Sequence, residues 1–326
     1  MSSTSLLDIP TVQIAPNGSF AEELQRTMAA VSMRFSWFGI NRSVTPTQKE
    51  QAAETFDAKG QFVSMGKKLI DTSHPAWKAI VKVRGKIQKH WETGSLPFPQ
   101  TGVRLVRRDE LETFLEQMRG LQNELQEAEQ ELNVYYDRIR KRAKENLGDL
   151  YDKNDYPASL IGKFTVAWDF PNVEAPDYLR MVSPALYRQE QERVRNRFEE
   201  AITLAENAFF NELLNMVDHL IERLSGSEDG KPKVFRDTAV TNLNEFFDRF
   251  QRLNIGSSED LDRMVNNVQR IMDGTTPESL RNSDSLRQQV SSRLSVVQSE
   301  LDGLMVDRPR RNLILPPPDM EMVQAG

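Results

Sequence analysis

A heptad repeat between Leu111 and Leu147 constrains the fold of this chain more than any other feature. Apolar residues recur there at alternating steps of three and four over four heptads, which is the a/d spacing of a coiled coil. Because seven residues make two turns at 3.5 residues per turn, this seam stays on one side of the helix and needs a partner along its whole length. The candidate assembly seam consists of Leu111, Phe114, Met118, Leu121, Leu125, Ala128, Leu132, Tyr135 and Ile139. Arg142 takes the next d position, so we expect the seam to fray there or to meet an acidic partner.

A second long helix is the obvious partner. Ser183 followed by Pro184 is a strong helix start, and an apolar periodicity continues from Val194 to Leu224 before a stop at Ser225–Gly226. Each helix has about 40 residues and would be about 60 Å long at 1.5 Å per residue. Matched lengths favour a hairpin within one chain, although each helix could equally bind its copy in another subunit of a homo-oligomer.

Composition fits long helices better than a compact sphere. Hydrophobic residues make up 38% of the 326 residues and charged residues 28%, while sixteen Phe and four Trp still supply a core. The length allows one large or two modest domains. The chain has no cysteine, which excludes disulfides and thiolate metal sites and fits a reducing cytoplasm. Its start lacks the signature of a signal peptide, and no apolar run reaches the roughly 20 residues of a membrane span. We therefore expect a soluble cytoplasmic protein with no transmembrane segment.

Charge is distributed unevenly along the chain. The net charge is −6, but the segment from Lys59 to Arg108 holds eleven Lys or Arg against Asp71 and Glu92, which gives +9. The first 58 residues carry −2, so the residues from Asp109 onward carry −13. A basic segment attached to an acidic helical body is therefore expected.

The basic segment contains a helix from Pro75 to Trp91, capped by Ser73 or His74 and stopped at Gly94. Its lysines lie opposite its apolar face, and Trp77 is expected nearer the lysines than the core. Phosphate binding without base readout is one interpretation, since such a face neutralises a polyanion. A solvated lysine face is the other, with an acidic membrane surface as a third. The candidate face for DNA, RNA or an acidic partner comprises Lys78, Lys82, Lys86, Lys89, Trp77, Arg104, Arg107 and Arg108.

Helix and strand signals give a mainly α (α+β) fold. A helix is expected over 20–31, a strand over 33–38, a helix from Pro46 to Phe56, and short strands over 62–70 and 103–106. Asp109 and Glu112 form a candidate capping box for the heptad helix. The predicted parts are an arm (1–30), a small basic α+β module (31–108), the first coiled-coil helix (109–147), a linker (148–183), the second coiled-coil helix (184–225), a helical bundle (233–307) and a Pro-rich tail (308–326). Within the bundle, helices are expected over 238–253, 258–272 and 283–305, with a turn at 277–280.

The linker contains a strand-like stretch, KFTVAWDF, from Lys163 to Phe170. A lone strand at the tip of a helical hairpin would have no sheet to join. It either returns to the N-terminal strands or pairs between subunits, and the first arrangement is favoured.

No motif in the sequence indicates catalysis, a cofactor or a metal. His74, His90 and His219 have no partner at a metal-ligand spacing. The glycines near Lys231 differ from a phosphate loop in spacing, and Pro232 stands where Ser or Thr is required. The basic cluster from Arg138 to Lys144 is interpreted as a partner of the helix dipole. The chain is expected not to be an enzyme.

Three stretches resemble a known family: MRFSWFGI (33–40), KFTVAWDFPNVEAP (163–176) and VFRDTAVTNLNEFFDRFQRLNI (234–255). They resemble an uncharacterised domain family of bacterial phages and mobile elements, often encoded beside a MoxR-type AAA+ ATPase and a von Willebrand factor A-type protein. The resemblance implies an accessory or assembly protein in a bacterial cell, acting with an AAA+ ATPase on nucleic acid or a large complex. It assigns no role to any residue.

The sequence therefore predicts a non-enzymatic, self-associating coiled-coil scaffold or adaptor. The alternative is a sequence-independent nucleic-acid-binding accessory factor that uses the basic helix.

Overall fold

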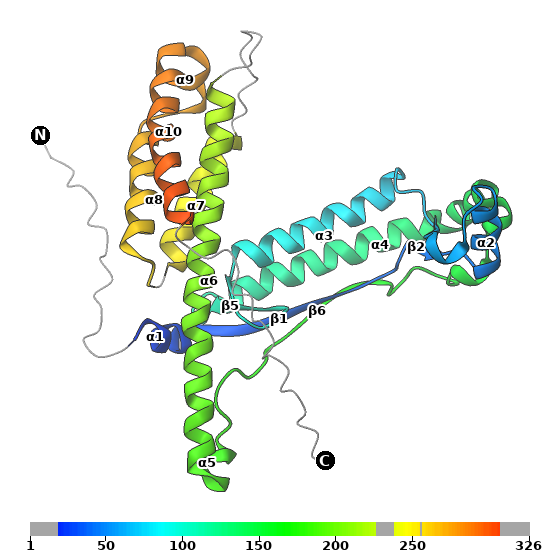
Figure 1. The fold of residues 1–326 in the computed structure, drawn as a ribbon, viewed down its shortest axis with the longest axis horizontal. Helices are drawn as coiled ribbons and strands as arrows, with labels where there is room; N and C mark the ends of the chain where they lie inside the picture. Colours follow the sequence, from blue (N-terminus) through cyan, green and yellow to red (C-terminus); the bar gives the residue numbers. More distant parts are fainter. Residues whose placement is uncertain (1–18, 226–237, 255, 307–326) are drawn as a thin grey trace, which may run out of the picture. The chain divides into compact units, whose positions relative to one another are not determined.

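The computed structural model describes residues 19–225, 238–254 and 256–306. It divides the chain into two compact units, the first ending at Leu204 and the second beginning at Ala205 (Figure 1). Helices dominate and a small sheet accompanies them, so the predicted mainly α (α+β) class is confirmed. The predictions for residues 1–18, the loop 226–232 and the tail 308–326 lie outside the described residues.

Strand β1 (Met28–Trp37) is the centre of a four-stranded antiparallel sheet with the order β4-β5-β1-β6. Strand β5 (Val103–Arg107) pairs with the first half of β1 and carries β4 (Leu96–Pro97) on its other edge. Strand β6 (Phe164–Asp169) pairs with the second half of β1, from Ser32 to Trp37. The linker strand thus returns to the N-terminal strands, which is the favoured arrangement.

The helix α1 (Phe20–Thr27) is shorter than predicted, because the chain enters β1 at Met28. Ser19 and Glu22 close a capping box at its start. Ala29 and Ala30 favour a helix by propensity, but they pair with Val106 and Leu105 of β5. Sheet pairing and burial outweigh a propensity difference of a few tenths of a kcal/mol.

Helices α3 (Pro75–Thr93) and α4 (Leu111–Leu147) form an antiparallel hairpin on one face of the sheet (Figure 1). Contacts between His90 and Phe114 at one end, and between His74 and Tyr135 at the other, fix their direction. The shared core takes Ile80 and Ile87 from α3, Met118, Leu125 and Leu132 from α4, and Val31, Val106, Phe164 and Val166 from the strands.

A small substructure, the tip, follows β1. Strands β2 (Asn41–Ser43) and β3 (Gly66–Lys68) pair with each other, and α2 (Pro46–Glu54) and the 3-10 turn η1 (Gly60–Phe62) lie between them in sequence. The strand predicted over 62–70 is thus confined to three residues. After α4, the turns η2 (Gly148–Leu150) and η3 (Lys153–Asp155) return beside the tip, where Lys67 donates a hydrogen bond to the carbonyl oxygen of Leu150 at 2.6 Å.

Helix α5 (Tyr178–Val182) precedes the long helix α6 (Pro184–Leu224), which begins at the predicted Ser183–Pro184 start. In the first unit, the ring of Phe198 packs against Phe98 at a centroid distance of 5.4 Å. Residues of α6 from Ala205 onward belong to the second unit.

The second unit is a helical bundle. Helices α7 (Thr238–Leu253), α8 (Glu259–Met272), α9 (Pro277–Asn282) and α10 (Asp284–Val306) lie within one or two residues of the predicted ranges. Phe209 of α6 packs edge-on against Phe246 and Phe250 of α7, with centroids 6.1 and 5.1 Å away. Side-chain caps at Ser258 and Thr276 account for two of the helix starts.

The predicted pairing of the two long helices is wrong. Helix α4 packs along α3 and β6, and no residue of α6 belongs to the core cluster that covers the seam. Near the start of α3, Tyr156 and Leu160 join the same core cluster, where the Leu160 N–H meets Asn133 and the Pro157 carbonyl oxygen meets Tyr136 of α4. The heptad pattern demands an apolar cover, and a shorter helix, a strand and a loop supply it together. The module 31–108, the helix 109–147 and the linker strand thus share one core.

The seam also drifts from the heptad frame. In its second half Tyr136 and Ala143 are buried beside Leu132 and Ile139, while Tyr135, at a predicted seam position, is half-buried and Arg142 is exposed. A straight helix has 3.6 residues per turn, so its buried stripe advances by about 0.2 residue per heptad, or nearly one residue over four heptads. This places Arg142 in solvent without a frayed seam.

The start of α4 also differs from the prediction. The helix begins at Leu111 without a side-chain cap, and the Asp109 carboxylate instead binds the Arg107 guanidinium, with Nη2 and Oδ2 2.6 Å apart. That hydrogen bond lowers the pKa of Asp109 below its usual value.

Candidate functional site

The predicted lysine face of α3 lies in solvent. Lys78, Lys82, Lys86 and Lys89 are exposed, whereas the opposite face, with Ile80, Val83 and Ile87, is buried. His74 caps the helix through Nδ1, which accepts the Ala76 N–H at 3.2 Å, and Pro75 occupies the first turn. Lys86 forms an ion pair with Glu124 of α4, so part of this face is neutralised by its neighbour.

The expectation for Trp77 is wrong. Its side chain is 6% exposed, and its ring meets the edge of Phe164 with centroids 5.9 Å apart. Helical periodicity alone places Trp77 at the edge of the apolar face of α3. Strand β6, about 90 residues later in the sequence, covers this edge and buries the side chain.

Three predicted arginines hold backbone and loop elements together instead of extending the lysine face. Arg104 Nε donates to Ser95 Oγ at 2.7 Å, and Arg107 binds Asp109. Arg108 Nε donates to the Met28 carbonyl oxygen at 2.9 Å. These bonds fasten β5 to the end of α3 and to the start of β1.

The predicted assembly seam is covered within the first unit. Leu111, Leu121 and Tyr135 are half-buried, and the remaining members are buried in the shared core: Phe114, Met118, Leu125, Leu132 and Ile139, with Ala128. The seam is therefore mostly covered by α3, β6 and residues 156–160, and only Leu111, Leu121 and Tyr135 keep part of their surface in solvent.

A polar stripe on α4 was missed by the sequence reasoning. Glu129 Oε1 accepts the backbone N–H groups of Lys163 and Phe164, both at 2.9 Å. Gln122 Nε2 donates to the Val166 carbonyl oxygen at 2.9 Å, and Asn133 Oδ1 accepts the Leu160 N–H at 2.9 Å. These residues follow one another at steps of seven and four, so they share a face of α4. They satisfy the free edge of β6 and fix its position.

The antiparallel hairpin also brings the basic end of α4 to the tip. Lys67 of β3, 7% exposed, joins the tip to the turns η2 and η3 that follow α4: its Nζ lies 2.8 Å from Asp155 Oδ2 and donates to the Leu150 carbonyl oxygen. Hydrogen bonds from Ser73 lower the pKa of Asp71, and the nearby charge of Arg142 contributes to this shift. The cluster from Arg138 to Lys144, interpreted from sequence as a dipole partner, therefore lies at the same end of the hairpin as Lys78.

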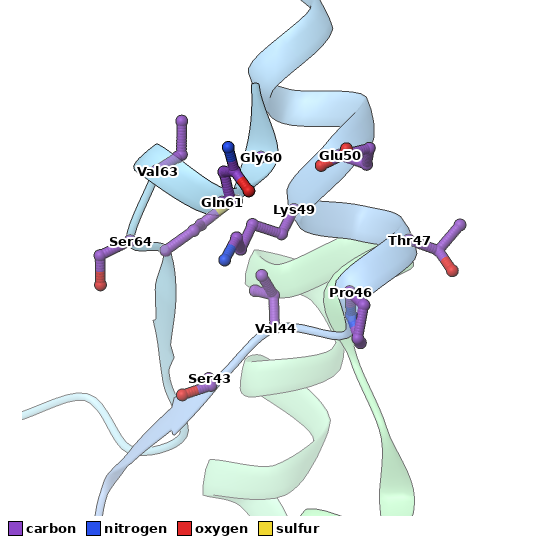
Figure 2. Close-up of a pocket in the computed structure, with 11 residues that line it drawn as sticks. Ser43, Val44, Pro46, Thr47, Lys49, Glu50, Gly60, Gln61, Val63 and Ser64 are labelled. Carbon is purple, nitrogen blue, oxygen red and sulfur yellow. The ribbon is translucent and has the colours of Figure 1, made fainter. Parts of the chain in front are cut away.

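The tip contains a pocket of about 650 Å³ between α2, η1 and the start of β3. Figure 2 shows the Lys49 side chain extending across it from α2, with Gln61 on the opposite wall and Val44 at its floor. The Glu50 carboxylate lies against Gly60, where a Cβ atom would stand 1.4 Å from Oε2, so a larger residue there would displace the end of this side chain. Lys49 has no ion-pairing carboxylate among the described residues.

An apolar ridge lies at the junction of α5 and α6. Met181 is 88% exposed and Val182 73%, and the half-exposed Tyr178 and Leu186 flank them. Large apolar side chains that gather in solvent, unlike isolated ones, mark interaction surfaces. The sequence reasoning missed this ridge because it treated the start of α6 as part of a coiled coil.

Metal and membrane features are absent from the part of the chain that the structure describes. Its His, Asp and Glu side chains form no group of three or more that could hold a metal ion, and none of its helices has the length and hydropathy of a membrane span. Two histidines have structural roles: His74 caps α3, and the ring of His90 stacks on Phe114 at 4.6 Å.

Comparison of the chain with protein-family models, curated proteins and solved structures finds no match.

Proposed function

We propose that this chain is a non-enzymatic adaptor that self-associates through the apolar ridge Tyr178, Met181, Val182 and Leu186. The exposure of Met181 and Val182, at 88% and 73%, is the observation that supports this proposal most directly. It replaces the α4 seam, which is covered within the chain, as the contact between subunits.

The charges beside the ridge favour a second copy as the occupant. A two-fold interface places the same surface patch against itself, so a patch of one sign would repel its copy. The first half of α6 instead mixes both signs, and its charges pair within the helix: Arg193 with Glu190 at 2.6 Å and Arg195 with Glu199 at 3.2 Å. This half of the helix has no large field of one sign, so it would not repel its copy.

The size of the ridge suggests an association of moderate affinity. Full burial of one large apolar side chain contributes roughly 1.5–3 kcal/mol, so eight partly exposed side chains from two copies contribute on the order of 10 kcal/mol. Lost translational and rotational freedom costs about 4–15 kcal/mol. These terms nearly cancel, so we expect an oligomer that dissociates on dilution. As an adaptor, the oligomer would present its remaining surfaces to an AAA+ ATPase, the partner that the family resemblance implies.

Light scattering behind a sizing column tests the proposal. The full chain should show a mass well above 37.4 kDa at high concentration and approach that value on dilution. The double variant Met181→Asp/Val182→Asp should remain at the monomer mass throughout. Val134→Asp/Val296→Asp changes two other exposed valines, 78% and 61% exposed, by the same charge and should behave as the unmodified chain. An unmodified chain that stays monomeric at high concentration would refute the proposal.

A further inference from the structure

Three segments that are distant in sequence converge at the tip end of the α3–α4 hairpin, and all three carry unpaired cations. The segments are the tip itself, the first turns of α3 and the last turns of α4. None of the cations in this distal basic end lies within ion-pairing distance of a carboxylate among the described residues. They are Arg42, Lys49, Lys59, Lys68, Lys78, Lys82, Arg138, Lys141, Arg142 and Lys144.

The cations of α3 and α4 share one outer face. Lys86 and Glu124 form an ion pair across the hairpin, so both point to that face from their helices. Arg142 follows Glu124 by 18 residues, which is five turns of 3.6, and therefore points in the same direction. Lys82 and Lys78 precede Lys86 by one and about two turns. Lys78 and Lys82 thus form a basic row on α3, while the same face of α4 carries the exposed Glu131 after Glu124 and becomes basic at Arg138 and Arg142, near the tip.

Two aromatic rings stand in solvent at the tip. Phe56, 80% exposed, lies in the short loop between α2 and η1, and Phe62, 81% exposed, is the last residue of η1. The sequence neighbours of Phe62, Gln61 and Val63, both line the tip pocket (Figure 2). A phenylalanine has no polar group that benefits from water, so such exposure fits a ring that meets a ligand.

We propose that the distal basic end, with Phe56 and Phe62, binds single-stranded nucleic acid without sequence preference. Cations gathered at one end of the hairpin contact the phosphates, and exposed aromatic rings stack on bases that a duplex would keep paired. The tip pocket adds the Lys49 amine and the Gln61 amide as polar groups at this end. The bases of a single strand offer stacking faces to Phe56 and Phe62, which favours single-stranded nucleic acid over an anionic membrane surface. This function is separate from the ridge at α5 and α6.

Fluorescence anisotropy with a labelled 20-mer oligothymidylate, measured across a salt series, tests the inference. Each phosphate contact with a single strand contributes about 0.7 to the slope of log affinity against log salt. Lys78→Gln/Lys82→Gln should therefore lower the slope by about 1.4 and weaken binding roughly 25-fold at 0.1 M salt. Arg138→Gln/Arg142→Gln should do the same, because the fold brings the end of α4 to this surface.

Two further variants separate charge from stacking. Arg26→Gln/Arg293→Gln removes two exposed arginines elsewhere and should leave the slope and the affinity unchanged. Phe56→Ser/Phe62→Ser should weaken binding by roughly five- to 150-fold per stacked base with little change in slope. Circular dichroism confirms that each variant is folded.

The inference is overturned if the full chain fails to bind the oligonucleotide at 50 mM salt, or if both charge variants bind it as the control does. Binding to phosphatidylserine-containing vesicles, with no binding to oligothymidylate, would also overturn it and would assign the surface to an anionic membrane.

Discussion

The carboxylate of Glu129, in the middle of α4, lies 2.9 Å from the backbone nitrogen of Phe164, at the start of β6. The side chain is 4% exposed, and the same oxygen also accepts the N–H of Lys163. A long helix and an edge strand are thus joined by a charged acceptor, which satisfies backbone donors that the sheet leaves unpaired.

Replacing Glu129 with alanine should lower the free energy of unfolding by about 2–6 kcal/mol. Two buried N–H groups lose their acceptor, and each unsatisfied group costs about 1–3 kcal/mol. Glu129→Gln keeps an amide oxygen in place and should lose less. Urea unfolding followed by circular dichroism measures both changes. Glu127→Ala, an exposed position on the same helix, should change stability by less than about 0.5 kcal/mol. Equal effects of the changes at 127 and 129 would contradict the role of the buried carboxylate.

Leu125 distinguishes a core within one chain from a seam between chains. It is 1% exposed, so Leu125→Ala should lower the free energy of unfolding by about 2–5 kcal/mol through lost contacts and a cavity. The folded variant should nevertheless keep the mass of the unmodified chain at every concentration, because no subunit contact involves this residue. Light scattering and urea unfolding on the same sample measure both properties. A stable variant with a reduced mass would restore the seam as an interface.

The two buried tyrosines, Tyr136 and Tyr156, should make the free energy of unfolding fall at alkaline pH. Burial raises the pKa of Tyr136 and of Tyr156 to about 12, and each hydroxyl donates to a backbone carbonyl: Tyr136 to Pro157 at 3.0 Å and Tyr156 to Leu69 at 3.1 Å. Below pH of about 10 both states hold neutral phenols, so these groups give no pH dependence. Between about pH 10 and 12 the unfolded chain ionises first, which costs about 1.4 kcal/mol per pH unit for each tyrosine.

Urea unfolding at pH 9, 10 and 11 tests this expectation. The unmodified chain should lose stability above pH 10, and Tyr136→Phe/Tyr156→Phe should have a shallower dependence even if it is less stable at pH 9. Parallel curves for the two proteins would show that other groups cause the alkaline loss.

Local signals in the sequence predicted the helices well. Pro75 after a capping His74, and Pro184 after Ser183, mark helix starts that the structure reproduces, because caps and proline act within a few residues. The limits of β1 were predicted less well, since Ala29 and Ala30 become strand only through pairing with β5.

The periodicity of the sequence could not identify the elements that pack against α4. A heptad stripe shows that a helix needs an apolar cover, but it does not distinguish α6 from α3 and β6. The polar residues Gln122, Glu129 and Asn133 carried a usable signal, since uncharged and acidic groups along one edge of the seam indicate a backbone edge nearby. The basic ends of α3 and α4 meet only because the hairpin is antiparallel, which no single segment encodes.

Cross-linking through one introduced cysteine tests self-association at the ridge most directly, because the chain has no cysteine of its own. Leu186→Cys, treated with a short bismaleimide at micromolar concentration, should give a covalent dimer of twice the 37.4 kDa chain mass. Val134→Cys, at an exposed position on α4, should remain at the mass of one chain. No dimer from Leu186→Cys, or equal dimer from both variants, would contradict the proposed interface.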